Sequence, residues 1–357
     1  MQSQGSKGAG ELRYHGGNIN AARTLYPDAP EPWIDLSTGI NPVPYPVGTT
    51  EPSAWSRLPE AADLAALEAA ARVVYGARPD AGIVAAPGTQ ALIQWLPRLF
   101  PARRVGVLGF TYQEHATCWR EAGAAISTVT ALPDLAAFDI GIVVNPNNPD
   151  GRMVSPEDLA AVASCLARRG GRLVVDEAFM DLIGRQDSLV PHLPAAGAIV
   201  LRSFGKAYGL AGVRLGFAAG SPEDCERLRQ AMGPWAVSGP AIDIGRRALA
   251  DETWRAETAT RLHHEAGRLD ALLLAAGFDV VGGTPLFRLG RRSGAGEVFG
   301  HLCRAGILTR PFQARPDWLR FGSPGAAAEW ERLRTALRDH AAGSRNPSPA
   351  RSAVPVP

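Results

Sequence analysis

Short apolar runs alternate with helical patterns between about residues 83 and 218, and this alternation limits the possible folds more than any other feature. The runs are almost continuously apolar, as expected for strands that are buried on both faces. Such an α/β order favours a doubly wound, mostly parallel sheet that binds ligands at the carboxyl ends of its strands. The predicted strands are residues 83–86, 104–108, 140–145, 173–176, 198–202 and 214–218.

Two of the predicted helices have readable ends. Ser155 precedes a proline and two acidic residues, and the same Ser-Pro-Glu-Asp order recurs at Ser221. A serine can cap the first turn of a helix, proline fits its first position, and acidic side chains there interact favourably with the helix dipole. Gly170 is expected to end the first of these helices.

The pattern changes after Trp235 to long helices, at about 241–250 and 252–276, and then to short strands near 278–281, 286–290 and 319–321. A closing helix to about residue 341 completes what we predict to be a smaller α+β domain. The ends of the chain are rich in Gly, Ser and Pro, a composition typical of disorder. The expected organisation is a disordered leader at 1–11, an N-terminal arm at 12–45 that contributes to the small domain and the substrate site, a large domain at 46–240, a small C-terminal domain at 241–342 and a disordered tail at 343–357.

Composition excludes several classes of function. The net charge is 37 − 35 = +2 and the charges are interspersed, so neither nucleic acid nor an anionic membrane is an expected partner. The four cysteines lie far apart without nearby histidines, which predicts reduced, packing thiols and no metal site. No apolar run approaches the roughly 18 residues that span a bilayer. We therefore expect a cytoplasmic protein.

Lysine is almost absent from the chain. Only Lys7 and Lys206 occur among the 37 basic residues counted as lysine or arginine. Arginine can replace lysine wherever charge alone matters, but its guanidinium stays protonated and is a poor nucleophile. An ε-amine can lose its proton and condense with a carbonyl to form a Schiff base. Lys206 is therefore the first catalytic candidate.

Four further motifs precede Lys206 in a fixed order. Pro87-Gly-Thr-Gln-Ala91 opens a helix after a predicted strand, Tyr112 lies at the next helix start, and Asn145-Pro-Asn-Asn-Pro-Asp-Gly151 follows a buried strand. Asp176 ends another strand, 30 residues before Lys206. Each motif alone also fits a plain structural role, such as a cap, a core tyrosine or a turn. As an ordered set, they resemble the fold type I family of pyridoxal-phosphate enzymes, the aspartate aminotransferase superfamily.

This resemblance implies a role for each matched residue. Lys206 would bind the aldehyde of pyridoxal 5'-phosphate, Asp176 would keep the pyridine nitrogen protonated, and Tyr112 would stack on the ring. Asn148 would donate a hydrogen bond to the phenolic oxygen O3′. His115 matches a group that hydrogen-bonds the aspartate, and a purely structural histidine is the alternative. The residues expected to bind the phosphate end of the cofactor are Gly88, Thr89, Gln90, Ser203 and Arg214.

Two positions depart from the pattern of the superfamily. Phe179 stands where aminotransferases usually have a tyrosine that also donates to O3′, so the electronics of the bound cofactor should differ. Leu58 occupies the position of a tyrosine that reaches the phosphate of the neighbouring subunit in relatives. We therefore expect the phosphate to be held with less redundancy in this chain.

The predicted substrate site begins near the amino terminus. His15-Gly-Gly-Asn18 and the segment from Ser37 to Pro42 resemble the threonine-phosphate decarboxylases of cobalamin biosynthesis, and the resemblance runs from about residue 14 to residue 339. It implies that His15 and Gly16 contact the substrate near its phosphate, although a glycine pair also fits a plain turn. Gly39 lies where relatives have an asparagine that touches substrate, so Thr38 or backbone amides would have to replace that contact.

The late part of the chain offers two arginines for the same substrate. A molecule with both a carboxylate and a phosphate needs two cationic anchors, and the resemblance assigns these to Arg310 and Arg320. Arg320 also matches the general carboxylate-binding arginine of the superfamily. Asn148 is an expected substrate contact as well, and Phe179 is typical of the decarboxylase branch.

These resemblances lead to one hypothesis and two alternatives. The hypothesis is that L-threonine O-3-phosphate loses CO₂, is reprotonated at Cα by Lys206 and leaves as (R)-1-aminopropan-2-yl phosphate, with a homodimer as the working unit. The main alternative is a histidinol-phosphate aminotransferase, which shares every cofactor residue but needs 2-oxoglutarate. The other is a non-catalytic regulator that uses this fold to sense ligands. Such regulators carry a DNA-binding domain before the fold, and we expect the segment before His15 to be too short for a winged helix.

Overall fold

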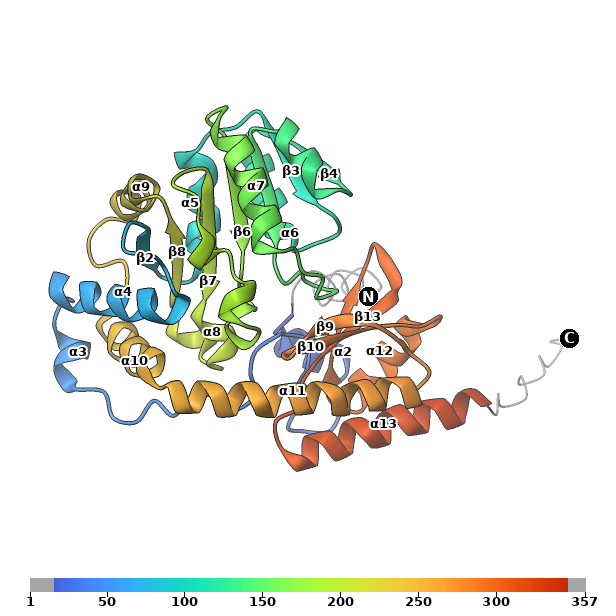
Figure 1. Cartoon of the computed structure of the whole chain (residues 1–357). Helices are drawn as coiled ribbons and strands as arrows, with labels where there is room; N and C mark the ends of the chain where they lie inside the picture. Colours follow the sequence, from blue (N-terminus) through green and yellow to red (C-terminus); the bar gives the residue numbers. More distant parts are fainter. Residues whose placement is uncertain (1–15, 346–357) are drawn as a thin grey trace, which may run out of the picture. The chain divides into compact units, whose positions relative to one another are not determined.

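The computed structural model describes residues 16–345, with side chains as far as residue 341. The described chain divides into two compact units (Figure 1). The large unit comprises Gly39–Ala266 and Gly282–Arg288. The small unit comprises residues 16–38, 267–281 and 289–345.

A seven-stranded sheet organises the large unit, in the order β2-β8-β7-β6-β5-β3-β4. Neighbouring strands from β4 to β7 run parallel, whereas β8 is antiparallel to both β2 and β7. The prediction of a mostly parallel α/β sheet is therefore confirmed. The strands are β2 Gly82–Ala86, β3 Arg104–Leu108, β4 Ala125–Val129, β5 Ile140–Val144, β6 Arg172–Asp176, β7 Ala198–Ser203 and β8 Gly216–Gly220.

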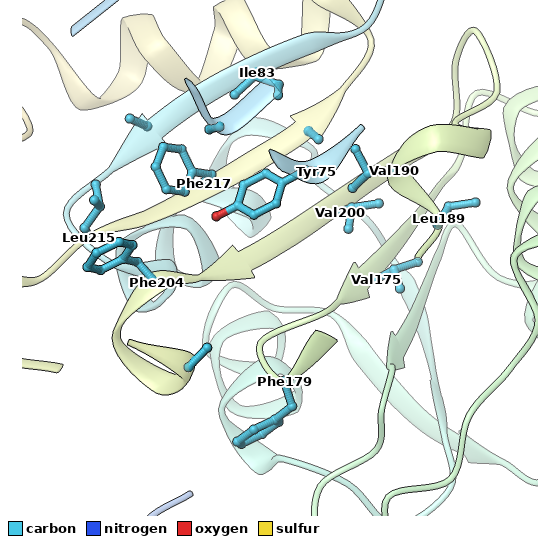
Figure 2. Close-up of a cluster of buried hydrophobic side chains, with 14 of the residues drawn as sticks. Tyr75, Ile83, Val175, Phe179, Leu189, Val190, Val200, Phe204, Leu215 and Phe217 are labelled. Atoms are coloured by element: carbon cyan, nitrogen blue, oxygen red, sulfur yellow. The ribbon is translucent and has the colours of Figure 1, made fainter. Parts of the chain in front are cut away.

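The sheet is buried on both faces, as its apolar runs predicted. Val175 and Val200 belong to one core cluster, part of which is drawn in Figure 2, while Val174 and Ile199 belong to another. Helices α4 Ala61–Tyr75, α7 Pro156–Ala167 and α10 Gly239–Ala250 contribute to the first cluster, and α5 Thr89–Leu99, α6 Gln113–Glu121 and α9 Pro222–Met232 to the second. The remaining α-helices that begin in this unit are α3 Pro52–Ser56, α8 Phe204–Ala207 and α11 Glu252–Ala275.

Two features of the sheet differ from the prediction. The strand predicted at 214–218 begins only at Gly216, because Arg214 adopts a left-handed conformation with φ 54° that a strand cannot contain. Strand β4 was not predicted, since its side chains are half-buried or exposed at the edge of the sheet and form no apolar run.

The predicted helix ends at Ser155 and Ser221 are confirmed. The Oγ atom of Ser155 accepts the backbone N–H of Asp158 at 3.1 Å, and that of Ser221 accepts the N–H of Asp224 at 3.1 Å. A proline follows each serine at the first helical position. Each cap satisfies one of the N–H groups that a helix start leaves without an intrahelical partner.

The small unit has its own core, which α12 and α13 share with α2, β13 and other segments of that unit. A four-stranded sheet in the order β12-β13-β10-β9 and a parallel pair of β1 with β11 make up its strands. Helix α13 extends to Arg345, past the predicted end near residue 341. The elements are α2 Ile19–Leu25, β1 Ile34–Asp35, β9 Asp279–Thr284, β10 Phe287–Arg291, α12 Ala295–Arg304, β11 Ile307–Leu308, β12 Arg310–Phe312, β13 Arg315–Gly322 and α13 Ala327–Arg345. Residues 282–284 of β9 and 287–288 of β10 are counted with the large unit.

The cysteines are free thiols, and Cys118, Cys225 and Cys303 are buried. Burial raises the pKa of Cys225 and of Cys303 to about 12, which suits packing rather than reactivity. Within residues 16–345, no helix has the length and apolar character needed to cross a membrane.

Candidate active site

The start of α5 in the large unit lies close to the side chain of Arg214. A side chain at Gly88 would place its Cβ 2.8 Å from Nη2 of Arg214, so the glycine leaves room for the guanidinium. Gly216 likewise allows close approach, because a Cβ there would lie 2.7 Å from the backbone nitrogen of Thr89. A helix N-terminus beside an arginine is suited to hold a phosphate. The cofactor phosphate predicted here therefore fits these residues.

Arg214 is held in place by its own turn. It ends the short helix at Ala211–Val213 in the left-handed region, and its Nη1 donates to the carbonyl of Ala211 at 3.2 Å. A non-glycine residue in this conformation is uncommon and often marks a functional constraint. Here the constraint aims the guanidinium at Gly88.

Tyr112 and Gln90 contact one another across two helix starts. The Tyr112 hydroxyl donates to Oε1 of Gln90 at 3.4 Å, and Nε2 of Gln90 donates to Glu114 at 3.2 Å. Tyr112 is the N-cap residue of α6, and its ring lies edge-on to His115 with ring centres 6.3 Å apart. The structure thus brings together Tyr112, predicted to stack on the cofactor ring, Gln90, predicted at its phosphate end, and His115, predicted to contact Asp176.

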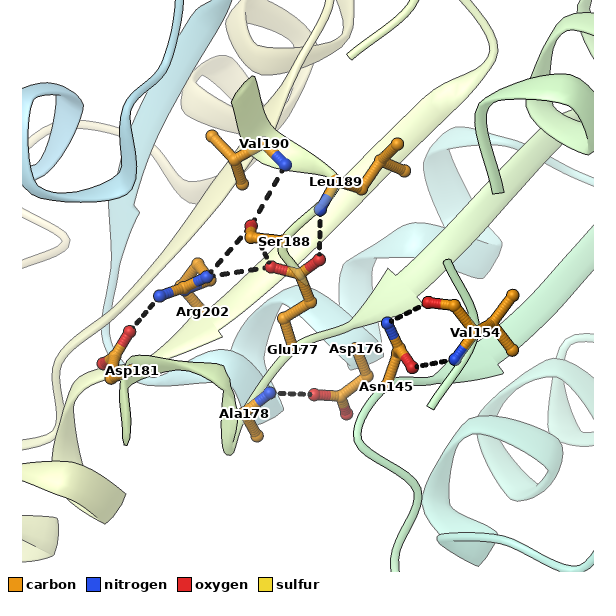
Figure 3. A network of polar contacts seen from close by, with 10 residues as sticks. All are labelled: Asn145, Val154, Asp176, Glu177, Ala178, Asp181, Ser188, Leu189, Val190 and Arg202. Atoms are coloured by element: carbon orange, nitrogen blue, oxygen red, sulfur yellow. Dashed lines mark hydrogen bonds and ion pairs between the residues drawn. The ribbon is translucent and has the colours of Figure 1, made fainter. Parts of the chain in front are cut away.

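Asp176 and His115 form a buried pair at the end of β6. Nε2 of His115 lies 2.8 Å from Oδ2 of Asp176, and the backbone N–H of Ala178 donates to Oδ1 at 3.0 Å (Figure 3 shows the second contact). The predicted contact between histidine and aspartate is confirmed. Only 4% of Asp176 is exposed, so its charge acts in a medium where it is weakly screened. Such a carboxylate can keep a ring nitrogen protonated.

Lys206 lies in α8, directly after β7. Its Nζ atom is 5.8 Å from the centre of the Phe179 ring. The backbone around the lysine is anchored by Asn41, whose N–H donates to the carbonyl of Lys206 at 2.9 Å and whose Nδ2 donates to that of Ala207 at 2.9 Å. Arg261 in turn donates to Oδ1 of Asn41 at 2.9 Å. The sequence singled out Asn41 only as part of a substrate motif, and this anchoring role was missed.

The loop that carries Asn148 is fixed from both sides. Asn145 exchanges two hydrogen bonds with the backbone of Val154, at 3.1 Å and 2.8 Å (Figure 3). Nδ2 of Asn147 donates to Asp150 at 2.7 Å and to the carbonyl of Phe110 at 3.0 Å. The neighbouring asparagines therefore shape the loop around Asn148.

The small unit contains three of the predicted substrate residues, Gly16, Arg310 and Arg320, whereas Gly39 and Asn148 belong to the large unit. Arg310 on β12 pairs in register with Arg320 on β13. Burial, aided by the charge of Arg310 and opposed by that of Asp35, lowers the pKa of Arg320 to about 9. Two guanidinium groups that disfavour each other in a buried position become more stable when an anion binds between or beside them.

Ser37 links Arg320 to the glycine pair near the amino terminus. Nη2 of Arg320 donates to the carbonyl of Ser37 at 2.7 Å, and the N–H of Gly17 donates to its Oγ at 2.7 Å. A side chain at Gly16 would place its Cβ 2.4 Å from the same carbonyl oxygen. Gly16 therefore belongs to a close backbone contact. His15 lies outside the described residues.

A second charged network lies in the large unit, on the face of the seven-stranded sheet opposite to Asp176 (Figure 3). Sequence reasoning missed this network. Nη1 of Arg202 donates to Oε2 of Glu177 at 2.8 Å, and its Nη2 forms a short ion pair with Asp181. Ser188 donates to Glu177 at 2.6 Å, and the guanidinium lies 4.4 Å from the Tyr75 ring centre. The signal was an arginine in an otherwise apolar strand, where a charge needs a buried partner.

The match to known proteins extends over most of this chain. The model of the family described as aminotransferase class I and II matches residues 49–337. The chain belongs to this family.

Two of its relatives are named threonine-phosphate decarboxylase. The protein from Pseudomonas aeruginosa is 43% identical over 90% of this chain and 96% of its own length, and the one from a Sinorhizobium species is 44% identical over 90% and 97%. A solved histidinol-phosphate aminotransferase from Sinorhizobium meliloti, in complex with pyridoxal-5'-phosphate, shares the fold with a TM-score of 0.78 at 20% identity, covering 92% of this chain and 95% of its own.

Proposed function

We propose that this protein decarboxylates L-threonine O-3-phosphate to (R)-1-aminopropan-2-yl phosphate and CO₂ with pyridoxal 5'-phosphate, as a step of cobalamin biosynthesis. The observation that carries this proposal is the identity of 43–44% over nine-tenths of the chain with two threonine-phosphate decarboxylases. The Arg310–Arg320 pair supports it independently, because a doubly anionic substrate requires two cationic anchors.

The residues of the large unit would hold the cofactor. The start of α5, with Gly88, Thr89 and Gln90, would bind its phosphate together with Ser203 and Arg214. Tyr112 would cover the ring and Asn148 would donate to its phenolic oxygen. When bound, the cofactor accepts the electron pair that is left on the α-carbon after a substituent departs. Asp176 would hold a proton on the ring nitrogen, and Lys206 would deliver a proton to the α-carbon.

The substrate anchors decide which bond breaks. A bond to the α-carbon is weakened when it stands perpendicular to the ring, so the protein selects the reaction by where it holds the carboxylate and the side chain. Arg320 and Arg310 would bind the two anionic groups, with His15 and Gly16 near the phosphate. Ser37 supports this arrangement, because it bonds both Arg320 and the residue after Gly16.

A histidinol-phosphate aminotransferase is the alternative. It would use the same cofactor residues and also accept a phosphorylated substrate, and the solved structure with that name shares the fold. It differs in its need for an amino acceptor, whereas the decarboxylase needs no second substrate.

One experiment separates the two functions. The purified protein, loaded with pyridoxal 5'-phosphate, is incubated with threonine phosphate with and without 2-oxoglutarate, and CO₂ and glutamate are measured. We expect CO₂ in both mixtures and no glutamate. Glutamate without CO₂ would refute the proposal. Serine phosphate, free threonine and histidinol phosphate serve as comparison substrates.

Two variants test the assigned roles in the same assay. Lys206→Ala should abolish both turnover and the absorption band of the lysine-bound cofactor. Arg310→Gln should raise KM for threonine phosphate by about 10- to 100-fold while the cofactor band stays unchanged, since one charge-assisted anchor contributes about 1.5–3 kcal/mol. A changed band in Arg310→Gln would place this arginine at the cofactor instead.

We also propose a cytoplasmic homodimer. Several large apolar side chains of the large unit are strongly exposed, among them Trp55 (71%), Leu58 (65%) and Trp235 (58%). Exposed aromatic residues are typical of protein interfaces. Sedimentation should give twice the chain mass, and Trp55→Glu should shift the protein toward monomers. A monomeric parent protein would contradict this assignment.

A further inference from the structure

Three residues far apart in the sequence meet beside Lys206. The rings of Phe179 and Phe287 pack edge to face, with centres 5.0 Å apart and an angle of 80°. A Cβ at Gly39 would lie 2.8 Å from Cε1 of Phe179 and 3.0 Å from Cδ1 of Phe287. Real Cβ atoms essentially never approach other atoms to 2.8 Å, so any side chain at position 39 would displace the Phe179 ring.

The segment that carries Phe287 also contacts the loop of Asn148. A Cβ at Gly151 would lie 2.0 Å from the carbonyl oxygen of Gly283, and a Cβ at Gly282 would lie 2.2 Å from that of Asp150. Both contacts join backbone to backbone and leave no room for a side chain. Gly151 has φ 73°, which independently favours glycine.

We propose that the segment Gly282–Phe287 is a positioning element of the cofactor site. Phe287 sets the Phe179 ring beside the amine of Lys206, and Gly39 acts by the side chain that it lacks. The glycine contacts of the same segment fix the loop of Asn148. The position of the Phe179 ring therefore depends on the glycine at position 39, since the ring occupies the space that a side chain there would fill.

The arrangement matters chemically because Phe179 has no hydroxyl group. The centre of its ring lies 5.8 Å from Nζ of Lys206, so this side chain offers the amine no hydrogen-bond partner. Its effect on the amine depends on where the ring stands, because a cation and a ring face attract only at short range. Phe287 is 1% exposed, so its role is to pack against this ring rather than to meet solvent.

The small unit contains a matched control. Phe278 and Phe321 also pack edge to face, with centres 5.5 Å apart and an angle of 83°. A Cβ at Gly290 would lie 2.7 Å from Cδ1 of Phe278. Gly290→Ala therefore causes the same kind of clash within the core of the small unit, whereas the residues assigned to the cofactor belong to the large unit.

The test compares Gly39→Ala, Phe287→Leu, the double variant and Gly290→Ala. The readouts are the affinity of the apoprotein for pyridoxal 5'-phosphate, the wavelength and pH dependence of the cofactor absorption band, and thermal unfolding of the apoprotein. Gly39→Ala should weaken cofactor affinity by about 10-fold and change the band, because displaced groups near a reacting centre cost about that much or more. Gly290→Ala should lower stability and leave affinity and band unchanged.

The double variant decides whether the residues are coupled. Gly39→Ala and Phe287→Leu both act by moving the Phe179 ring, so the loss of cofactor affinity in the double variant should be smaller than the sum of the two single losses. Fully additive losses would overturn the proposal, as would a Gly39→Ala protein that matches Gly290→Ala. If Gly39→Ala does not fold, Phe287→Leu must still change the band; an unchanged band refutes the proposal.

These readouts need only the cofactor, although the inference rests on the cofactor assignment of the proposed function. A wrong substrate would leave every expected result in place. Failure to bind pyridoxal 5'-phosphate at all in the unaltered protein would instead count against the proposed function.

Discussion

Asp176 and Glu177 are neighbours in sequence, and both are buried carboxylates at the end of β6, yet their surroundings differ. Asp176 follows Val174 onto the face that carries α6, where it meets His115. Glu177 follows Val175 onto the opposite face, where it meets Arg202 and Ser188. Successive side chains along a strand point to opposite faces, and this alternation separates the two acids.

The end of β6 can therefore serve both stability and chemistry. Glu177 is completely buried and accepts hydrogen bonds from Ser188, Leu189 and Arg202. These bonds reach both oxygens of its carboxylate, so it is suited to join β6, β7 and the segment between them. Asp176 accepts from His115 and one backbone N–H, and it lies at the edge where parallel strands bind ligands. The first acid supports the fold, and the second is placed to act on a ligand.

We expect the largest effect when Glu177 loses its arginine partner. Arg202→Met leaves the charges of Glu177 and Asp181 buried without their arginine, and loss of one partner of a buried pair costs about 3–5 kcal/mol. Urea unfolding of the apoprotein, followed by tryptophan fluorescence, should show a correspondingly lower midpoint.

The matched control removes the charges on both sides. The triple variant Arg202→Met, Glu177→Gln, Asp181→Asn buries no ion and should recover most of the lost stability. If Arg202→Met unfolds at the midpoint of the unaltered protein, the network does not support the fold.

Asp176→Ala tests whether this acid acts in the reaction. We expect turnover of threonine phosphate to fall by about 10²- to 10³-fold, the loss typical when one preorganised electrostatic group is removed. The urea midpoint should change far less than in Arg202→Met. The comparison between the two acids fails if Asp176→Ala loses stability but keeps its activity.

His115 should act through Asp176 and not on substrate directly. It is fully buried, and its Nδ1 has no hydrogen-bond partner among the described residues, so its one polar contact is with the aspartate. His115→Phe should lower kcat by about 10-fold, in line with the loss of one charge-assisted hydrogen bond. Steady-state kinetics should show little change in KM for threonine phosphate. His115→Gln, which can still donate, should retain more activity.

The sequence predicted one of these acids and not the other. Asp176 was found because it ends a buried strand at a family spacing from Lys206. Glu177 and Arg202 were not, because their pairing depends on the register of β6 with β7, which sequence patterns do not show. Gly39 was read as a lost contact, since nothing in the sequence brings it beside Phe287. The edge strand β4 was missed because half-exposed strands lack a continuous apolar run.

The smallest expected effect concerns the titration of Glu177. Burial raises the pKa of Glu177 above its ordinary value of 4.5, against the opposing effect of Arg202 and the hydrogen bonds from Ser188 and Leu189. A carboxyl group with a higher pKa in the folded state binds its proton more tightly there. Its contribution to stability is therefore fully present below the unfolded pKa and is lost as the pH rises through the folded pKa.

Glu177→Gln removes this titration, so the contribution of Glu177 is the difference in pH-dependent stability between the unaltered protein and the variant. As the pH is lowered from 7 toward 5, the unaltered protein should gain stability relative to the variant, by at most about 1.4 kcal/mol per pH unit. Urea unfolding of both apoproteins at several pH values measures the difference, and Glu226→Gln at an exposed position is the control. The opposite trend would mean that the Arg202 charge outweighs burial and that Glu177, like a paired surface acid, has a lowered pKa.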